Sequence, residues 1–153
     1  MDAAHRYRLD VADETWVVAA PEVVAAAVHD EAAWARWWPD LVPAVTRDRG
    51  VKGVQWAVTG ALAGSMEIWV EPWGDGAVLH WYLRADPTPP DDVRRRRRAG
   101  ERDDRVRAWK IHAFALKDRL EAGREPGSRR TEGPGASDRG QRVKDPGEPA
   151  ESS

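Results

Sequence analysis

The sequence of 153 residues contains no cysteine. Disulfide bonds, thiolate catalysis and cysteine-ligated zinc sites are therefore excluded, and a reducing, cytoplasmic location is the expectation. The N-terminal stretch MDAAHRYRLDVADE lacks the basic segment and the apolar core of a secretory signal peptide. No apolar run approaches the roughly 20 residues that cross a bilayer. We therefore expect no membrane span.

Metal-binding and phosphate-binding motifs are also missing. The four histidines are scattered and form neither an HxH nor an HExxH pattern, so we expect no metal site. The stretch GALAG lacks the lysine and the glycine spacing of a phosphate-binding loop. Ser65 lacks the strand–turn–helix context of a nucleophile elbow. We therefore expect no cofactor, and no motif assigns a catalytic residue.

The formal net charge is only −2, but the charges are unevenly distributed. Residues 1–93 carry 7 Lys+Arg against 15 Asp+Glu, residues 94–122 carry 11 against 5, and residues 123–153 carry 6 against 6. The chain is therefore an acidic body followed by a basic segment and a neutral tail. The small net charge argues against a protein that binds nucleic acid over its whole surface.

Five consecutive arginines, Arg94–Arg98, form the most concentrated charge in the sequence. One interpretation is contact with RNA, DNA or anionic lipid. The other is a solvated helix end whose charge is compensated by Glu101, Asp103 and Asp104. Because the segment lacks the aromatic residues that stack on bases in single-strand binding, we expect no nucleic acid to bind there.

Residues 123–153 contain one valine as their only large apolar side chain. Glycine, proline, serine and charged residues make up most of the rest. Such a segment buries too little apolar surface to offset the entropy lost on ordering, so we expect a disordered polar tail. The folded domain is expected to span residues 1–122.

Tryptophan, in contrast, is abundant, with nine residues against two tyrosines and one phenylalanine. Three of them fall in the stretch WARWWPDL. At helical spacing, Trp34, Trp37 and Trp38 share one face. Pro39 ends the helix directly after them.

The chain is expected to begin with a long strand over HRYRLDV and TWVVA, with a bulge near residues 12–14. Two short helices follow. Pro21 suits the first position of one helix, and Asp30 caps the other.

Four runs of alternating residues come next: VPAVTRD, GVQWAVTG, GSMEIWVEPW and AVLHWYLRA. In the last three runs one face is apolar, which indicates half-buried strands of an antiparallel sheet. The apolar faces contain Val54, Trp56, Val58, Met66, Ile68, Val70, Leu79, Trp81 and Leu83.

The pair Asp75-Gly76, between the last two runs, is typical of a two-residue hairpin turn. This turn predicts Glu67 opposite Arg84 and Glu71 opposite His80. Charge then meets charge across the two strands, which supports the pairing. We interpret both pairs as structural contacts on the outer face of the sheet.

A long helix is expected from Asp91 or Asp92 to about Glu121. Ile111 and Phe114 lie away from its apolar stripe, so they either pack against another element or mark a self-association surface. The stripe itself contains Val106, Trp109, Ala113, Leu116 and Leu120.

In this order of elements the chain resembles the helix-grip fold of the START-like SRPBCC superfamily, particularly bacterial proteins labelled polyketide cyclase/dehydrase and lipid transport. The resemblance covers about residues 5–122 and rests on the segments AAPEVVAAAV, ARWWPDL, GSMEIWVEPWGDG and RAWKIHAFALKDRLE. It implies an α+β fold in which a curved antiparallel sheet wraps around the C-terminal helix. The family's sheet has seven strands, whereas about five are predicted here, which implies a smaller or more open cavity.

The resemblance also implies a cavity between the sheet and the last helix, with a hydrophobic or aromatic small molecule, lipid-like or polyketide-like, as the partner. Trp34, Trp37 and Trp38 then either form an aromatic lid or simply seal the core. The expected ligand-binding residues are Trp38, Trp56, Met66, Ile68, Trp81, Leu83, Trp109, His112, Ala113 and Leu116.

Two further functions stay open. One is a polyketide cyclase/dehydratase that folds a polyketide chain and moves protons. His112, beside the apolar stripe, could face the cavity as an acid or base because histidine titrates near neutrality, or it could be a flanking residue in contact with solvent. No carboxylate partner is assigned to it, so the catalytic residues stay unknown. The other function is an interaction module that uses Arg94–Arg98 or the surface of Ile111 and Phe114, and the sequence leaves the oligomeric state open.

Overall fold

The structure is a computed structural model, and it describes residues 5–88 and 98–123. The expected beginning of the last helix at Asp91 or Asp92, most of the arginine run and the tail from residue 124 lie outside the described residues. In chain order the elements are β1 (Leu9–Val17), α1 (Pro21–Val28), α2 (Glu31–Trp37), β2 (Leu41–Asp48), the 3₁₀ helix η1 (Gly50–Lys52), β3 (Gly53–Gly60), β4 (Leu62–Trp73), β5 (Gly76–Pro87) and α4 (Arg98–Leu120).

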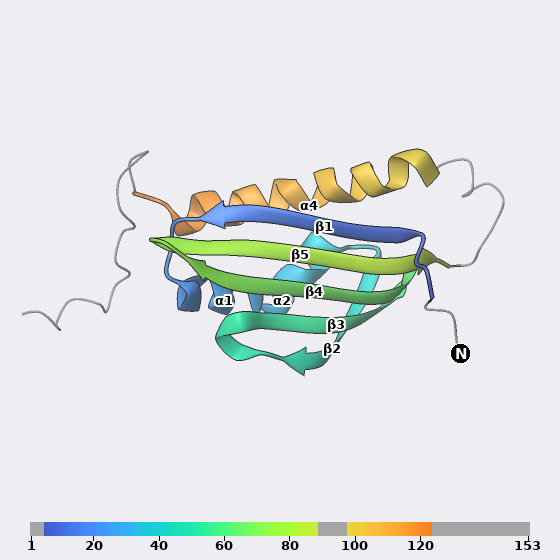
Figure 1. Ribbon diagram of the computed structural model, residues 1–153, viewed down its shortest axis with the longest axis horizontal. Coiled ribbons are helices and arrows are strands. Elements are labelled where there is room, and N and C mark those ends of the chain that lie inside the picture. The colour runs from blue at the N-terminus through green and yellow to red at the C-terminus, as the bar shows by residue number, and fades with distance from the viewer. Residues whose placement is uncertain (1–4, 89–97, 124–153) are drawn as a thin grey trace, which may run out of the picture.

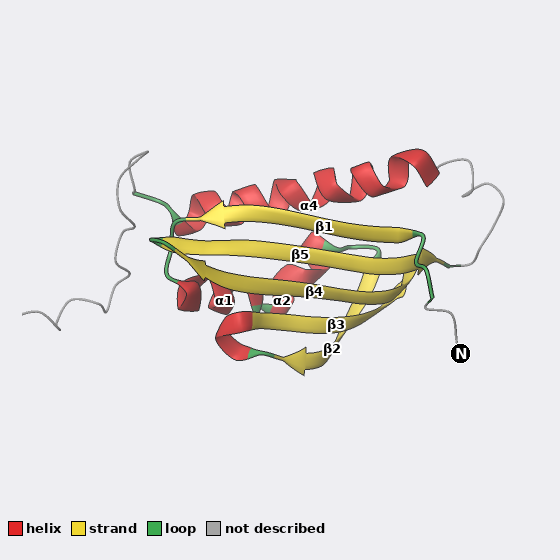
Figure 2. Cartoon of the chain, in the orientation of Figure 1, coloured by secondary structure: helices red, strands yellow, loops and turns green. Residues whose placement is uncertain are grey.

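The five strands form one antiparallel sheet in the order β1-β5-β4-β3-β2. Figure 1 shows α1 and α2 behind this sheet and α4 running along the edge strand β1. In Figure 2 the strands form a single layer with α1, α2 and α4 behind or above it, and η1 joins β2 to β3 at its edge. The expected α+β class, with five antiparallel strands, two short helices and a long C-terminal helix, is confirmed.

The two faces of the sheet differ as the alternation predicts. Side chains such as Trp56, Ile68 and Trp81 point toward the helices and are almost completely buried. Their neighbours Glu67 and Tyr82 lie on the opposite side, which we call the outer face, and remain partly exposed. The core therefore lies between the inner face of the sheet and the three α-helices, because only there does apolar surface meet apolar surface.

The helices start and end as the local sequence predicts. Pro21 occupies the first position of α1, where its missing N–H is not needed. The side chain of Asp30 accepts a 3.2 Å hydrogen bond from the N–H of Ala32 and caps α2. Along α4, Trp109, Ala113 and Leu116 are buried, so the predicted apolar stripe faces the sheet.

The β4–β5 register differs from the predicted one by two residues. The turn is Gly74-Asp75 with Trp73 opposite Gly76, so Glu67 lies opposite Tyr82 and not opposite Arg84. Gly76 belongs to β5 and not to the turn because β1 packs closely beside it. A Cβ on Gly76 would lie 2.2 Å from the carbonyl oxygen of Val17 in β1. Gly74 instead supplies the positive φ, +54°, that the first turn position requires.

The predicted bulge near residues 12–14 is wrong as well. β1 pairs with β5 without interruption from Leu9 opposite Ala85 to Val17 opposite Ala77. The irregularity lies in β2, where the register shifts between Val45 and Arg47. The polar stretch of β1 stays in register because Asp13 and Thr15 find an ion-pair and hydrogen-bond partner on α4, as shown below.

Candidate ligand-binding groove

Six of the nine tryptophans meet in the core at the end of α2. The Trp109 ring lies in the middle, with ring centroids 5.6 Å from Trp37, 5.7 Å from Trp38 and 5.3 Å from Trp81. Trp56 adjoins Trp38 at 5.3 Å and Trp34 at 5.1 Å. Rings at such separations attract one another beyond their burial. The cluster exists because α2 ends over the inner face of the sheet, where Trp56 and Trp81 already point inward.

A groove with a volume of about 560 Å³ opens beside this cluster. Its walls come from the end of α2, the chain that follows it, the β3–β4 connection, β5 and the first half of α4. The lining residues are Trp37, Trp38, Pro39, Asp40, Ala61, Trp81, Glu101, Asp104, Arg105, Ala108 and Trp109.

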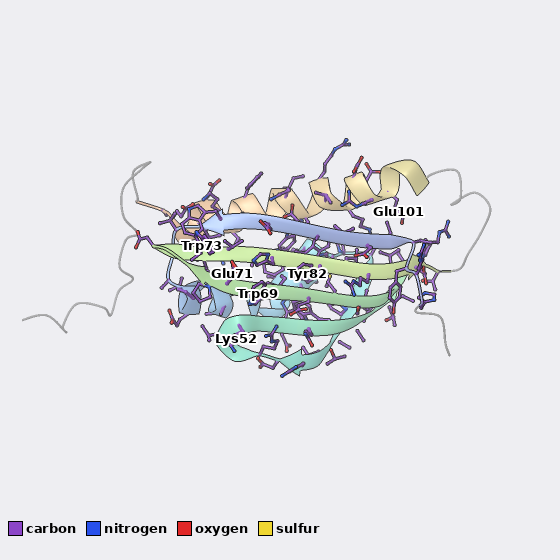
Figure 3. The ribbon with its side chains drawn as sticks, in the orientation of Figure 1. Lys52, Trp69, Glu71, Trp73, Tyr82 and Glu101 are labelled. Atoms are coloured by element: carbon purple, nitrogen blue, oxygen red, sulfur yellow. The ribbon has the colours of Figure 1, made fainter. Side chains whose placement is uncertain are left out.

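The rim of the groove is polar and is tied together by an ion pair. Arg105 of α4 donates two hydrogen bonds to the carboxylate of Asp40, of 2.8 and 2.6 Å. These bonds hold the pKa of Asp40 below its ordinary value, against the opposing effect of its burial. Glu101, which Figure 3 places near the N-terminal end of α4, and Asp104 add two further carboxylates. Asp104 also lies 3.7 Å from Arg107, so the rim carries three carboxylates against two guanidinium groups.

The indole N–H groups of the cluster differ in their hydrogen bonding. Trp34 donates a 2.8 Å bond to the carbonyl oxygen of Val28. The buried nitrogens of Trp38, Trp56, Trp81 and Trp109 have no acceptor among the described residues. Three of these four rings, those of Trp38, Trp81 and Trp109, line the groove.

No family model matches the sequence, and neither does any curated protein. Solved structures do match. An Aha1 dimer from Colwellia psychrerythraea is 15% identical over 76% of this chain and 99% of that chain, with a TM-score of 0.50. A conserved protein of unknown function from Enterococcus faecalis is 14% identical over 78% of each chain, with a TM-score of 0.51. An AHSA1-like protein from Rhizobium etli is 17% identical over 93% and 95%, with a TM-score of 0.49.

This chain has the START-like helix-grip fold. At these identities the likeness shows the fold alone. The fold-level resemblance expected from the sequence is therefore confirmed, including the reduced, five-stranded sheet.

Within the START-like fold, the expected ligand-binding residues separate into three groups. Those at the groove are Trp38, Trp81 and Trp109. Those that are almost completely buried in the core away from the groove are Trp56, Met66, Ile68, Leu83 and Ala113. His112 and Leu116 line a separate pocket of about 200 Å³ beside Arg36 and Arg119. The space between the middle of α4 and the sheet is thus filled by side chains, and the opening lies toward one end.

Sequence reasoning missed the rim residues Asp40, Arg105 and Ala108. Arg105 lies one helical turn before Trp109, so its position on the inner side of α4 was readable from the spacing. Its partner Asp40 is far away in the sequence, and no local pattern connects the two. The ends of α2 and of the β3–β4 connection come together only in the folded chain.

The predicted pairs on the outer face are partly wrong. Glu67 pairs with Arg49 at 2.8 Å, whereas Arg84 lies 3.5 Å from Asp10, because the two-residue register shift separates Glu67 from Arg84. His80 lies opposite Trp69 and not opposite Glu71 as predicted, although its Nε2 still lies 3.8 Å from the Glu71 carboxylate.

His80 is buried although it lies on the outer face. Its ring stacks on Trp69 with centroids 4.5 Å apart, and Nδ1 lies 3.6 Å from Glu14. Figure 3 shows Trp69, Glu71 and Tyr82 on this face. Burial, and then the nearby glutamates, raise the pKa of Tyr82. We assign these residues to the surface of the sheet, because the groove opens on its other side.

A second inward-facing polar cluster joins α4 to β1. The Lys110 Nζ lies 3.0 Å from the Asp13 carboxylate and donates hydrogen bonds to the carbonyl oxygen of Glu14 and the hydroxyl of Thr15. Lys110 therefore donates two hydrogen bonds and forms one ion pair in this cluster. It holds the helix against the edge strand and does not line the groove.

Within residues 5–88 and 98–123, no group of three or more histidine and acidic side chains is placed to hold a metal ion. In the same part of the chain, no helix is both long and apolar enough to cross a membrane.

Proposed function

We propose that this protein binds an apolar small molecule in the groove beside the tryptophan cluster. The observation that carries the proposal is the groove itself: about 560 Å³ of open space lined by Trp37, Trp38, Trp81 and Trp109, in a core that is otherwise filled. The volume lies within the roughly 300–1,000 Å³ of typical ligand pockets.

The chemistry of the walls supports this proposal. Four tryptophans lie in the walls, together with Pro39, Ala61 and Ala108, and burying a ligand against such apolar walls contributes about 25 cal/mol per Å² of apolar surface removed from water. The flat faces of the tryptophans also favour a flat or aromatic ligand, because offset stacking adds to the burial. The START-like fold commonly binds hydrophobic ligands, which agrees with this use of the groove.

The proposal describes binding and includes no reaction. The carboxylate of Asp40 accepts hydrogen bonds from both terminal nitrogens of Arg105, so we assign it a structural role at the rim of the groove. His112, the predicted acid or base, lines the separate pocket beside Arg36 and Arg119. The histidine expected for the cyclase/dehydratase alternative therefore lies outside the groove.

Ala108 offers a direct test, because it lines the groove from the exposed side of α4. In Ala108→Phe the added ring fills the groove without entering the packed core. We expect wild-type protein to bind a flat apolar probe such as fluorene saturably, at one site per chain, and Ala108→Phe to bind it at least about tenfold more weakly. Equilibrium dialysis gives the affinity, and native mass spectrometry of freshly purified protein shows any co-purifying molecule.

Ala115→Phe is the matched control, since Ala115 is equally exposed on the same helix but lies outside this groove. It should bind fluorene as the wild type does. Wild-type protein that binds no apolar probe at all, or an Ala108→Phe variant with unchanged affinity, would show that the groove is not a ligand site.

A further inference from the structure

The tryptophan cluster contains donors that the folded chain leaves unused. The indole nitrogens of Trp38, Trp81 and Trp109 are buried and have no acceptor among the described residues. An indole N–H is a donor only, and a buried tryptophan usually finds a partner for it. Native structures contain few such groups, so three at one groove need an explanation.

The arrangement of the rings indicates where the missing acceptors would come from. Trp109 stacks on Trp38 with an interplanar angle of 16° and on Trp81 with an angle of 29°. All three rings also form the wall of the groove. The three nitrogens are themselves buried, so a molecule in the groove reaches them when the rings turn about their side-chain bonds. Each N–H that turns toward the molecule then gains an acceptor.

We propose that the ligand is a neutral, flat apolar molecule carrying a carbonyl oxygen, which accepts hydrogen bonds from Trp109 and from one of its two stacked neighbours, Trp38 or Trp81. This inference rests on the proposed binding function and specifies its ligand class. A carbonyl oxygen accepts two hydrogen bonds and adds no donor that would need a partner. It therefore complements a wall that holds donors only.

The rim argues for a neutral ligand. Asp40 and Arg105 neutralise each other through their two hydrogen bonds, which leaves at the entrance the carboxylates of Glu101 and of Asp104, the latter 3.7 Å from Arg107. A carboxylate ligand would be repelled by them. An ammonium ligand would be attracted by them and by the ring faces, but it would leave the indole donors without acceptors.

Four ligands with the same tricyclic skeleton separate these possibilities. Fluorene has no polar group, 9-fluorenone has a carbonyl, 9-aminofluorene is a cation, and fluorene-9-carboxylate is an anion. We expect fluorenone to bind about tenfold more tightly than fluorene, as two net hydrogen bonds allow, and the anion to bind most weakly. Equal affinities for fluorene and fluorenone, or tightest binding of the amine, would overturn the carbonyl inference while the groove remains a binding site. Binding of none of the four would overturn both proposals.

The indole signals report the contact directly. A nitrogen-15 correlation spectrum of the protein contains one indole N–H signal for each of the nine tryptophans. Fluorenone should move the signal of Trp109 and that of either Trp38 or Trp81 downfield, as hydrogen bonding does, and fluorene should not. The Trp34 signal should stay in place, because its N–H already bonds to Val28. A downfield shift of the groove signals with fluorene as well as fluorenone would contradict the inference.

Replacing one donor tests the preference for the carbonyl. Trp109→Phe keeps a ring in the groove but removes the N–H, so the preference for fluorenone over fluorene should fall severalfold. Trp73→Phe is the control, since Trp73 is exposed at the end of β4 and lies outside the groove. If Trp109→Phe prefers fluorenone over fluorene as strongly as the wild type does, Trp109 is not a hydrogen-bond donor to the ligand. Should that variant fail to fold, the four-ligand comparison and the spectra on wild-type protein still decide the inference.

Discussion

His29, the last residue before the α2 cap, has an acceptor at each ring nitrogen. Nδ1 donates to the carbonyl oxygen of Ala25 at 2.6 Å, and Nε2 donates to the carboxylate of Asp48 at 2.9 Å. Both bonds exist together only when the imidazole carries two protons. Burial acts to lower the pKa of His29, but these bonds outweigh it and raise the pKa above its ordinary value. The N–H of Gly50, and then His29, lower the pKa of Asp48.

The raised pKa of His29 predicts a pH dependence of stability. The stabilisation is complete below the unfolded-state pKa of about 6.5 and is lost as the pH rises through the higher folded-state pKa. We therefore expect Asp48→Asn to lower the thermal midpoint more at pH 5.5 than at pH 8.5. Thermal unfolding followed by circular dichroism at the two pH values measures the difference.

Asp10→Asn serves as the control for this prediction, because Asp10 faces Arg84, whose charge does not change between these pH values. Its effect on the midpoint should be the same at both. An Asp48→Asn variant that loses equal stability at pH 5.5 and 8.5 would contradict the coupling to His29.

At the level of single residues, the sequence predicted the side chain faces well and the register poorly. The stretch Gly74-Asp75-Gly76 contains two overlapping two-residue turns, and local turn chemistry accepts either. The choice depends on β1, whose Val17 carbonyl leaves no room for a side chain at Gly76. Because the error was two residues, every side chain kept its predicted face.

Between elements, the Lys110 cluster joins α4 to the edge of the sheet. Asp13 is nearly buried, with 9% of its side chain exposed, against 26% for Lys110. Burying these polar residues on the inner side of the edge strand therefore costs little folding free energy, because the helix supplies their partner. This partner lies 97 positions along the chain from Asp13, so the alternation of β1 gave no sign of it.

Lys110→Met should destabilise the fold by roughly 2–3 kcal/mol, less than the loss of a fully buried pair, because it leaves the Asp13 carboxylate without its cation. Adding Asp13→Leu should recover most of this loss, since an apolar pair of similar size needs no charge partner. Denaturant unfolding of the wild type, both single variants and the double variant gives the coupling. Additive effects would show that the two side chains do not interact.

The position of the groove is also a property of how elements meet. The apolar stripe of α4 and the inner face of the sheet were readable from periodicity, and both are buried as expected. Periodicity does not tell whether two apolar surfaces touch or leave a space between them. Large side chains such as Trp56 and Met66 fill the middle, and the space remains where α2, α4 and the β3–β4 connection fail to close.

For the molecule as a whole, the groove connects ligand binding to folding stability. The rings that line it, Trp38, Trp81 and Trp109, are also part of the single hydrophobic core. A ligand that binds only the folded chain adds about 2.7 kcal/mol of stability when present at 100 times its dissociation constant. For a domain of this size, each kcal/mol raises the thermal midpoint by roughly 4 °C.

We therefore expect 9-fluorenone at about 100 times its dissociation constant to raise the thermal midpoint of the wild type by roughly 10 °C. The same concentration should leave the midpoint of Ala108→Phe nearly unchanged, because the added ring occupies the groove. Ala115→Phe should follow the wild type, since Ala115 lines the separate pocket beside His112 and not this groove. Differential scanning calorimetry measures all three. An equal rise in all three proteins would mean that the ligand stabilises the chain from some other site, and the groove would then be only an irregularity in the packing of α2 against α4.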